Sequence, residues 1–441
     1  MKNYLSLMTL VCGVWLSSSH AAEVLPLQNS SVLTQLTVKT VGTTTLGSDV
    51  EGLLHYAREH NPSLAASLFD VEAAAQRVQP ATALPDPVLR AELMDITNQG
   101  TTGPRLLPTQ VGSTRYLLMQ TVPWFGKRDL KRETAEADAE QVRGKSAATW
   151  AELAMQIKSA YAQYYFVAGN QKITRDLLDL VVQMEQVAQV RYANGLAAQQ
   201  DAIRAQVEQT TMKTELVMLD NSKRQIEARL NALLSRPATM PLAAPQGLRN
   251  IPATARLENL AELEKRIREH NPDLFVDEAG IRASEKSRDL VQKNRYPDFT
   301  LGLSPTQFGT AVREWGVMVE LNIPLQQESR RSQERESEAM LAAAKARKEA
   351  TANRVLSALT ESLSGIDAAR RTEQLSETGL LPQANITFES ALISYQTGKV
   401  DFATLLDAAR QVLNARLEVL KAQTEAQMRL AEIERLLGEE L

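Results

Sequence analysis

The sequence has almost no cysteine and little histidine, the residue types that most often bind transition metals. Its only cysteine is Cys12, and its histidines are His20, His55, His60 and His270. Residues 1–22 have the pattern of a secretory signal peptide, with a positive start, a short apolar run and small residues at the end. Cys12 lies in that run, and Thr9-Leu10-Val11 before it lacks the small residue of a lipid-modification site. Without the signal the chain has no cysteine, so we expect no disulfide and no thiolate metal site.

The sequence also lacks long apolar runs and an excess of basic charge. After residue 22 no stretch has the roughly 18 uninterrupted apolar residues of a membrane-spanning helix. The formal net charge is −4, without a basic stripe, which argues against a nucleic acid partner. There is no phosphate-binding Gly-Lys-Ser/Thr loop or zinc-protease His pair, and His60 and His270 fit helix ends better than metal sites. We therefore expect no enzyme, no cofactor and no metal site.

Long helices dominate what is present. Between Leu130 and Ser235 there is no proline, and the helical pattern is broken only at 192–201. A helix over 130–193 would be roughly 95 Å long, and the returning helix over 201–235 about half of that. The returning helix and a shorter helix over 62–83 together match the long one, which predicts that they stack end to end. Before the break, apolar residues follow a coiled-coil seam: Ile173, Leu177, Leu180, Met184 and Val187.

Four landmarks recur in the same order in the second half of the chain, with offsets of 210, 212, 201 and 203 residues. The pairs are Arg58–Leu64 and Arg268–Leu274, Pro85-Asp86 and Pro297-Asp298, Val122-Pro123 and Ile323-Pro324, and Tyr192–Gly195 and Tyr395–Gly398. We interpret the chain as two copies of one unit: helix, strand, strand, long helix, turn, half-length helix. The second long helix, over 326–394, is expected to kink near Gly379 and Pro382, and its returning helix covers 401–437.

Composition shifts give the predicted boundaries, and the first helix of the first unit is expected to start near Ser48, a capping residue. The boundaries are 1–22 for the signal peptide, 23–47 for an extended amino-terminal segment, 48–235 for the first unit, 236–255 for a Pro-rich equatorial connector and 256–441 for the second unit.

Alternating apolar residues predict two strands in each unit, at about 87–95, 114–122, 298–304 and 314–323. In the last of these, one face is apolar throughout, which is typical of a strand with lipid on one side and water on the other. A single such strand would equally fit a half-buried strand of a soluble sandwich. Four strands cannot close a barrel and lipid forbids an open edge, so such a chain would oligomerise. Three copies would give twelve strands around water.

Short motifs at the turns and before the long helix carry a family resemblance. They are Tyr192-x-x-Gly195-Leu196 with Asp201 after it, Tyr395-x-x-Gly398 with Leu406-Asp407-Ala408 after it, and Pro123-Trp124-Phe125-Gly126-Lys127. In this order and spacing, across nearly the whole mature chain, they resemble the TolC-like outer membrane efflux proteins. The Pro-Trp-Phe-Gly-Lys passage leans towards the branch that serves heavy-metal cation efflux.

The resemblance implies a mainly α fold with membrane β structure. The expected assembly is a homotrimer in the cell outer membrane, with a twelve-stranded β-barrel continued by a long periplasmic α-helical barrel. It would be the passive exit duct of a tripartite efflux or type I secretion system, for substrates such as heavy-metal cations or drugs. The implied partners are outer-membrane lipid, a periplasmic adaptor (membrane fusion protein) and an inner-membrane pump of the RND type.

The resemblance also implies that the two helix turns form a periplasmic tip that contacts the adaptor and narrows the pore. The adaptor-contacting candidates are Tyr192, Gly195, Leu196, Tyr395, Gly398 and Lys399. Family members often carry an acidic residue six positions after the turn glycine, which in the first copy is Asp201; the second copy departs from this with Thr404. The pore-constriction candidates are therefore Asp201, Asp401 and Asp407. Asp201 equally fits a helix N-cap, and the two roles are compatible.

A second function class stays open on the sequence alone. A periplasmic coiled-coil structural or adaptor-like protein without a membrane barrel would share the long helices. Adaptors usually carry small all-β domains between paired helices, and the sequence has no such block, which favours the duct.

Overall fold

The computed structural model describes residues 46–97, 99–100, 103–252 and 259–441. Residues Leu46–Leu441 belong to one compact unit. The signal peptide predicted at 1–22 and nearly all of the extended segment predicted at 23–47 lie outside the described residues, as does the end of the predicted connector.

Helices make up most of the described chain. The first half contains α2 (Val50–His60), α3 (Pro62–Gln76), α4 (Val78–Thr82), α5 (Lys127–Ala193) and α6 (Gln199–Leu233). The second half contains α8 (Leu260–His270), α9 (Pro272–Lys293), α10 (Gln327–Leu375), the π-helical turn η1 (Ser376–Leu380), α11 (Leu381–Gln396) and α12 (Phe402–Leu437). None of the helices in the described ranges is both long and apolar enough to cross a membrane.

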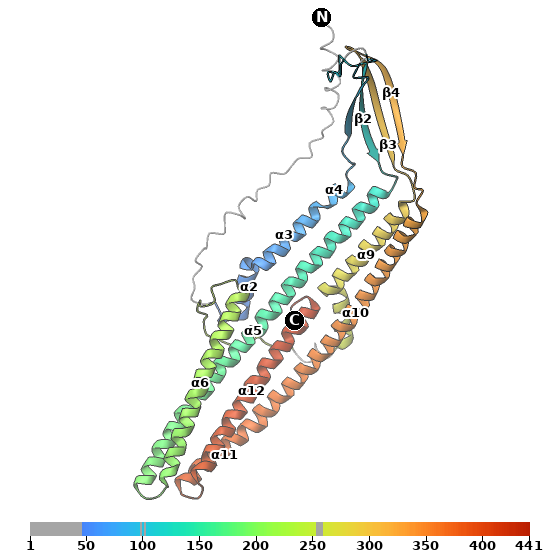
Figure 1. Cartoon of the computed structure of the whole chain (residues 1–441). Helices are drawn as coiled ribbons and strands as arrows, with labels where there is room; N and C mark the ends of the chain where they lie inside the picture. Colours follow the sequence, from blue (N-terminus) through green and yellow to red (C-terminus); the bar gives the residue numbers. More distant parts are fainter. Residues whose placement is uncertain (1–45, 98, 101–102, 253–258) are drawn as a thin grey trace. The chain divides into compact units, whose positions relative to one another are not determined.

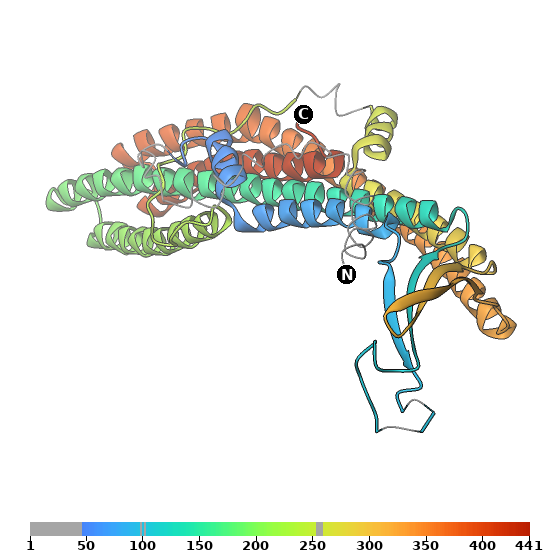
Figure 2. The same cartoon turned by 90° about the horizontal axis from the view of Figure 1, so that it is seen from above.

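The longest helix, α5, lies at the centre of the helical layer. It packs against α6 on one side and against α12 and α9 on the other, and Figure 2 shows it running between α6 and α12. In Figure 1 the strands lie at one end of the unit, and the turns that join α5 to α6 and α11 to α12 lie at the opposite end. The layer is thus built from two helical hairpins placed side by side.

Two asparagine–proline junctions connect the half-length helices to the short ones. The Asn61 side chain accepts hydrogen bonds from the backbone N–H groups of Ser63 (2.9 Å) and Leu64 (3.1 Å), which caps α3. Its amide also donates to the carbonyl of Leu233, at the end of α6, at 2.8 Å. Asn271 caps α9 in the same way and donates to the carbonyl of Leu436, at the end of α12, at 2.8 Å. Each returning helix therefore meets a short helix end to end, in agreement with the length argument.

The four strands form one antiparallel sheet in the order β1-β2-β3-β4. They are β1 (Val88–Met94), β2 (Ser113–Val122), β3 (Phe299–Phe308) and β4 (Ala311–Leu321). The central pair, β2 and β3, joins the two halves of the chain. Leu118 is opposite Leu303, and Leu303 is opposite Val317, so these three side chains share a face.

Two local expectations differ from the structure, and a third takes a specific form in it. Asp49, not Ser48, caps α2, because its carboxylate accepts the backbone N–H of Gly52 at 2.6 Å. The helix predicted over 62–83 is interrupted at Arg77, which separates α3 from α4. The kink expected near Gly379 and Pro382 takes the form of a π-helical turn.

A buried ion cluster joins the connector to the helical layer. Glu434 on α12 accepts hydrogen bonds from Lys158 Nζ on α5 at 2.8 Å and from both Nη atoms of Arg249 at 3.1 and 2.9 Å. The side chains of Glu434 and Lys158 are 3% and 5% exposed. The charges of Glu434 and Lys158 are thus compensated. Because the partners belong to α12, α5 and the connector, the cluster fixes these three segments relative to one another.

Candidate functional site: the paired helix turns

Two tight turns close the helical hairpins. One joins α5 to α6 through Gly195, and the other joins α11 to α12 through Gly398. Both glycines have left-handed backbones, with φ of 72° and 75°, a conformation that costs energy for any residue with a Cβ atom. Because both turns lie at the same end of the unit (Figure 1), the structure brings the candidates at the two turns to one end.

The candidates at these turns differ in accessibility. Tyr192, Leu196 and Lys399 are exposed, as a contact with a partner requires. Tyr395, also predicted to contact the adaptor, is only 2% exposed. In this conformation its ring packs edge-on against Phe402, with 5.5 Å between ring centroids, inside the core shared by the two hairpins.

A chain of polar contacts, here named the tip latch, joins the two hairpins through Arg191, Asp201, Tyr395 and Gln396. The Tyr395 hydroxyl donates to Asp201 Oδ2 at 3.2 Å. The guanidinium carbon of Arg191 lies 5.1 Å from the centroid of the Tyr395 ring. Arg191 Nη1 donates to the carbonyl of Gln396, and Nη2 donates to the carbonyl of Leu196 at 3.2 Å. The latch thus connects α5 and α6 to α11.

Burial, together with the neighbouring negative charge of Asp201, raises the pKa of Tyr395 to about 12. The hydroxyl therefore keeps its proton throughout the neutral range. It acts as a hydrogen-bond donor to Asp201, so the latch does not depend on pH through this tyrosine.

The expected helix cap belongs to Asp401 rather than Asp201. Helix α6 begins after Ala198, whose side chain makes no capping bond, and Asp201 lies in the first turn. Asp401 caps α12, because its carboxylate accepts the hydroxyl of Thr404 at 2.6 Å and the backbone N–H of Thr404 at 3.0 Å. These two bonds hold the pKa of Asp401 below its usual value. Thr404, which stands where an acidic residue was expected, is thus the partner of the cap.

The third constriction candidate, Asp407, lies beside an ion pair that links the two hairpins. Arg410 on α12 donates from Nε to Glu208 on α6 at 3.0 Å, and the Glu208 side chain is 7% exposed. Asp407 lies 3.7 Å from Arg410, and its side chain is 68% exposed. It is therefore free to face solvent, whereas Glu208 is engaged.

The sequence did not identify Arg191, Glu208 and Arg410 as members of this site. Their partners are 205 and 202 residues away in the chain, so no local spacing reveals the pairs. The only signal was the alignment of the two copies at their turns. It implies that the sequence neighbours of Tyr192 and those of Tyr395 lie close together in space.

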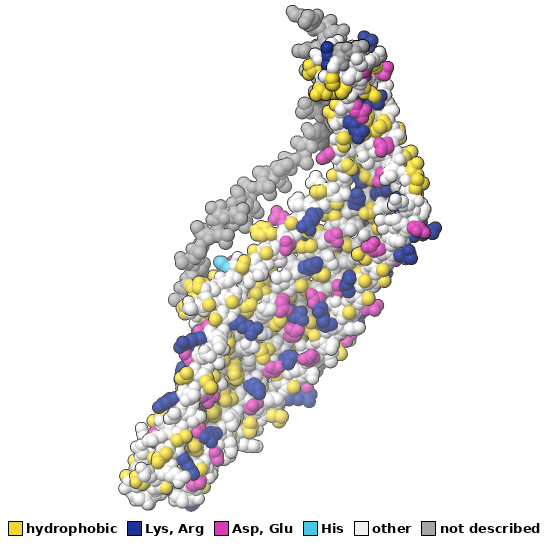
Figure 3. Space-filling model, viewed as in Figure 1, with side chains coloured by type: hydrophobic (Ala, Val, Ile, Leu, Met, Phe, Trp, Pro, Cys, Tyr) yellow, Lys and Arg dark blue, Asp and Glu magenta, His cyan; other side chains and the backbone are white. Residues whose placement is uncertain are grey.

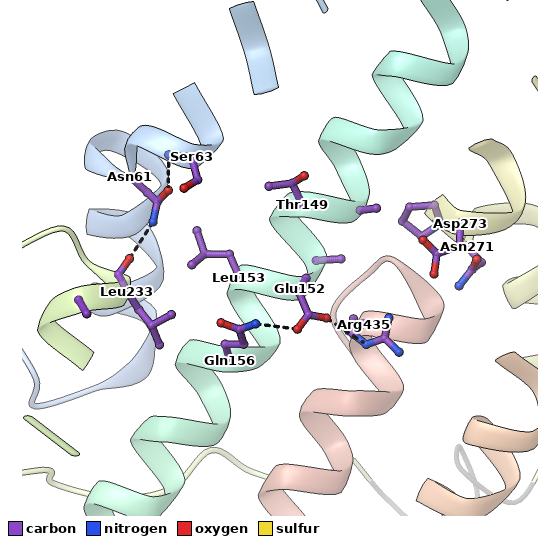
Figure 4. Close-up of a pocket in the computed structure, with 14 residues that line it drawn as sticks. Asn61, Ser63, Thr149, Glu152, Leu153, Gln156, Leu233, Asn271, Asp273 and Arg435 are labelled. Atoms are coloured by element: carbon purple, nitrogen blue, oxygen red, sulfur yellow. Dashed lines mark hydrogen bonds and ion pairs between the residues drawn. The ribbon is translucent and has the colours of Figure 1, made fainter. Parts of the chain in front are cut away.

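Elsewhere on the described surface, charged side chains are mostly paired with one another. Figure 3 shows Lys, Arg, Asp and Glu interspersed along the visible face of the helices. A hollow of about 600 Å³ lies beside α5 between the two asparagine–proline junctions (Figure 4). Its Glu152 is already engaged by Gln156 at 2.7 Å and approached by Arg435 at 3.7 Å. Within the residues that the structure describes, no three His, Cys, Asp or Glu side chains are grouped as a metal site.

Comparisons with known proteins agree with this architecture. Residues 263–439 match the family model described as outer membrane efflux protein. The cobalt-zinc-cadmium resistance protein CzcC of Cupriavidus metallidurans is 24% identical over 397 residues, which cover 88% of this chain and 90% of CzcC.

Among solved structures, the outer-membrane channel OprN has a TM-score of 0.76 at 21% identity, covering 88% of this chain and 89% of OprN. The outer membrane protein VceC of Vibrio cholerae also has a TM-score of 0.76, at 18% identity, covering 89% of this chain and 96% of VceC. The likeness extends over most of the length of both chains in each comparison. Residues 263–439 therefore match the outer membrane efflux protein family, and the chain has the fold of the outer-membrane channel OprN.

Proposed function

We propose that the chain is the outer-membrane exit duct of a tripartite efflux system and works as a homotrimer. The observation that carries this proposal is the exposed apolar face of the sheet. Trp315, Val317 and Val319 on β4 are 68%, 81% and 61% exposed. They are paired with residues of β3 that include the exposed Leu301 and Leu303. Soluble monomers rarely expose a contiguous patch of this kind, whereas lipid would cover it.

The height of this face fits a membrane. At about 3.3 Å per residue, the extended chain from Trp315 on β4 to Ile323, two residues past its end, is roughly 27 Å long. A strand tilt of about 40° reduces it to roughly 20 Å, close to the apolar band of about 25 Å in outer-membrane barrels. At the helical end of the strands, the Trp124 ring stacks on Tyr296 and Phe299, with 5.1 and 5.3 Å between centroids. Such aromatic residues are typical of the membrane–water interface.

The two edges of the sheet support a ring of copies. In the described chain, β1 and β4 each pair with one strand only. An open edge in lipid costs several kcal/mol for each unpaired group. We infer that β1 of one copy pairs with β4 of the next. Three copies give twelve strands and leave room for water, while the eight strands of a dimer would be filled by their own side chains.

The helical layer, like the sheet, has two open edges. Helix α6 forms one edge, and α10 with α11 forms the other. Both carry exposed apolar side chains, among them Ile203 and Val207 on α6 and Ile386 and Ile393 on α11. Contact of α6 with α11 of the next copy would cover these residues and close a periplasmic helical barrel below the strands.

The turns are the proposed contact with a periplasmic adaptor, and the tip latch is the proposed closure. Adaptor helices that engage Tyr192, Leu196 and Lys399 would separate the hairpins and break the contacts of Tyr395 with Asp201 and Arg191. Transport through the opened duct is passive, because the energy comes from an inner-membrane pump, here proposed to be of the RND type.

For the cargo we propose heavy-metal cations, the class named for CzcC. Three copies of Asp201, Asp401 and Asp407 would form rings of negative charge at the tip, which favour cations. Within the described residues there is no grouped metal site, which supports passage rather than tight binding. Organic drugs are the alternative cargo.

Planar-bilayer recordings on the detergent-purified protein test this function. We expect discrete ionic currents with a preference for cations. Replacing Asp201, Asp401 and Asp407 by Ala should weaken that preference, while Asp220→Ala on α6, in a surface pair with Arg224 at 2.5 Å, serves as the control. Unchanged selectivity would remove the three aspartates from the constriction. A cross-linking result that shows only monomers, or fractionation with soluble periplasmic protein, would favour the coiled-coil alternative without a barrel.

A further inference from the structure

The methionines of the sheet lie on the face opposite to its apolar one. Side chains alternate between the two faces along each strand, and the exposed apolar face carries Leu118 and Val317. Met94, Met119 and Met318 are the methionines of the four strands. All three have the opposite parity and lie on the other face, which lines the lumen of the proposed barrel. Lipid does not account for methionine there, because the interior of such barrels is polar.

Two of these methionines form one row across the sheet. Met119 on β2 is opposite Gly302 on β3, and Gly302 is opposite Met318 on β4. We call these three residues the methionine row. Both methionines in it are half-buried. Met94 lies apart from the row, at the end of β1, where it is opposite Ser113.

Polar side chains lie on the same face on both sides of the row. Further from the helices, Arg115 lies 3.9 Å from Glu92 on the neighbouring strand. Nearer to the helices, the hydroxyl oxygens of Thr121 and Thr300 are 3.2 Å apart, and Glu320 is opposite Thr300. The methionine row is thus an apolar, sulfur-containing band between two polar ones.

The glycine in the row keeps the space between the two methionines open. A Cβ atom at Gly302 would lie 3.1 Å from Met318 Cε and 3.1 Å from Leu117 Cδ1. The terminal methyl group of Met318 therefore lies over Gly302, on the side of β2, the strand that carries Met119. Any side chain at position 302 would fill the space that separates the two thioethers.

The width of the row fits a cation held between two sulfur atoms. Neighbouring strands are about 4.8 Å apart, so the Cα atoms of Met119 and Met318 are separated by roughly 10 Å. Methionine is unbranched and has three rotatable bonds, so two side chains that extend towards each other over Gly302 can bring both sulfur atoms to one ion. Thioether sulfur is a soft ligand that selects Cu(I) over the harder divalent cations.

We propose that Met119 and Met318 form a thioether site for soft monovalent cations, Cu(I) or Ag(I), in the lumen of the barrel. This inference rests on the proposed function as a duct, and it narrows the cargo from heavy-metal cations to soft ones. Three copies would repeat the pair around the lumen at one level. A conduit must release an ion as readily as it takes one up, and two neutral ligands beside water meet that requirement.

An Ag(I) titration of the detergent-purified protein, with isotope-labelled methionine methyl groups observed by NMR, tests the site. Ag(I) stands in for Cu(I) because it is stable in air. In chloride-free buffer it should shift the resonances of Met119 and Met318 before those of two exposed methionines, Met94 on the same face and Met218 on α6. Zn²⁺ added in the same way should leave the resonances of the row unchanged.

Substitutions separate binding from packing. Met119→Leu and Met318→Leu nearly keep the apolar volume, and each should weaken Ag(I) binding about tenfold or more, because one of two ligands is lost. Gly302→Ala keeps both sulfur atoms but fills the space between them, so it should also weaken binding. Met94→Leu is the matched control and should leave the affinity unchanged. In Met119→Leu, the Met318 resonance should no longer shift at low Ag(I), because the two side chains share the ion.

The outcomes separate this inference from the duct function. If Met94 responds to Ag(I) as early as the row does, if Zn²⁺ shifts the row equally, or if both leucine variants bind Ag(I) as well as the wild type, the thioether site is refuted. A K⁺ current through the same preparation in planar bilayers would then still support the duct. If the wild type carries no current, the duct function fails, and the assignment of this face to a lumen fails with it.

Discussion

Replacing Glu434 by Gln hardly changes the size of the side chain, but it is expected to destabilise the folded protein strongly. The carboxylate neutralises Lys158 and Arg249 at distances of 2.8 to 3.1 Å, and it also accepts the backbone N–H of Leu441 at 3.3 Å. Lys158 keeps a second partner, Glu440, at 3.2 Å, but that side chain is 73% exposed. Glu434→Gln therefore leaves two cations in or near the interior with inadequate compensation.

Breaking a buried pair by removing one partner typically costs about 3–5 kcal/mol. The remaining bond to Glu440 offsets part of this, so we expect a loss near the lower limit, about 3 kcal/mol. The matched control is Glu425→Gln on the same helix, which removes a pair with Arg429 at 2.7 Å whose side chains are 39% and 36% exposed. Exposed pairs contribute about 0–1 kcal/mol. Denaturant unfolding in detergent, followed by circular dichroism, measures the difference.

The same cluster predicts a pH dependence. Burial alone would raise the pKa of Glu434, but hydrogen bonds and charge from Arg249 and Lys158 hold it below the usual value. Since the folded-state pKa is below the unfolded one, the stabilisation is complete at neutral pH. It is lost as the pH falls from the usual glutamate range through the lower folded-state value. In Glu434→Gln, the free energy of unfolding should fall less steeply as the pH is lowered. Equal unfolding midpoints for Glu434→Gln and Glu425→Gln, or an unchanged pH dependence, would refute this reasoning.

Three further predictions concern the junctions, the turns and the sheet. Asn61→Ala with Asn271→Ala removes both helix caps and should cost about 1 kcal/mol for each cap, measured by denaturant unfolding against either single variant. Gly398→Ala forces a Cβ atom into a left-handed backbone at φ 75° and should cost about 1–2 kcal/mol; a neutral result in the same assay would mean that the turn rearranges freely. Val317→Arg on the apolar face should cost about 2–4 kcal/mol in lipid and reduce the assembled fraction on unheated gels, whereas Glu320→Arg on the opposite face should be tolerated.

Periodicity and turn residues predicted most of the elements, although the helix expected over 62–83 is divided at Arg77. The strand pattern around Trp315 and the proline-free stretch after Leu130 depend on residues close together in the chain, so local spacing predicts them. The stacking of α6 on α3 followed from lengths alone. The ends of elements were less predictable, because capping depends on which of several neighbouring side chains reaches the backbone. Asp49 rather than Ser48 caps α2 for that reason.

Only part of the site was predicted from the sequence. The turn glycines were found because a reversal between two long helices needs a residue that tolerates positive φ. The tip latch was not, since Arg191 and Tyr395 meet only when two hairpins pack side by side. The buried position of Tyr395 depends on the same packing, so the sequence did not show it. The pairing of Glu208 with Arg410 has no local signature at all.

From the pairing of β2 with β3 we expect a particular order of folding. Strands β2 and β3 bring together Thr121 and Thr300, 179 residues apart, and Tyr116 and Gln307, 191 residues apart. Closing so long a loop is entropically unfavourable until intervening structure shortens it. The helical hairpins are built from helices that are close together in the chain, so they are expected to form first. The β1–β2 and β3–β4 hairpins would then be close enough for β2 to pair with β3. Insertion into a bilayer would then be the last event of biogenesis, and a chain arrested before β3 emerges would have helices but no seam to insert.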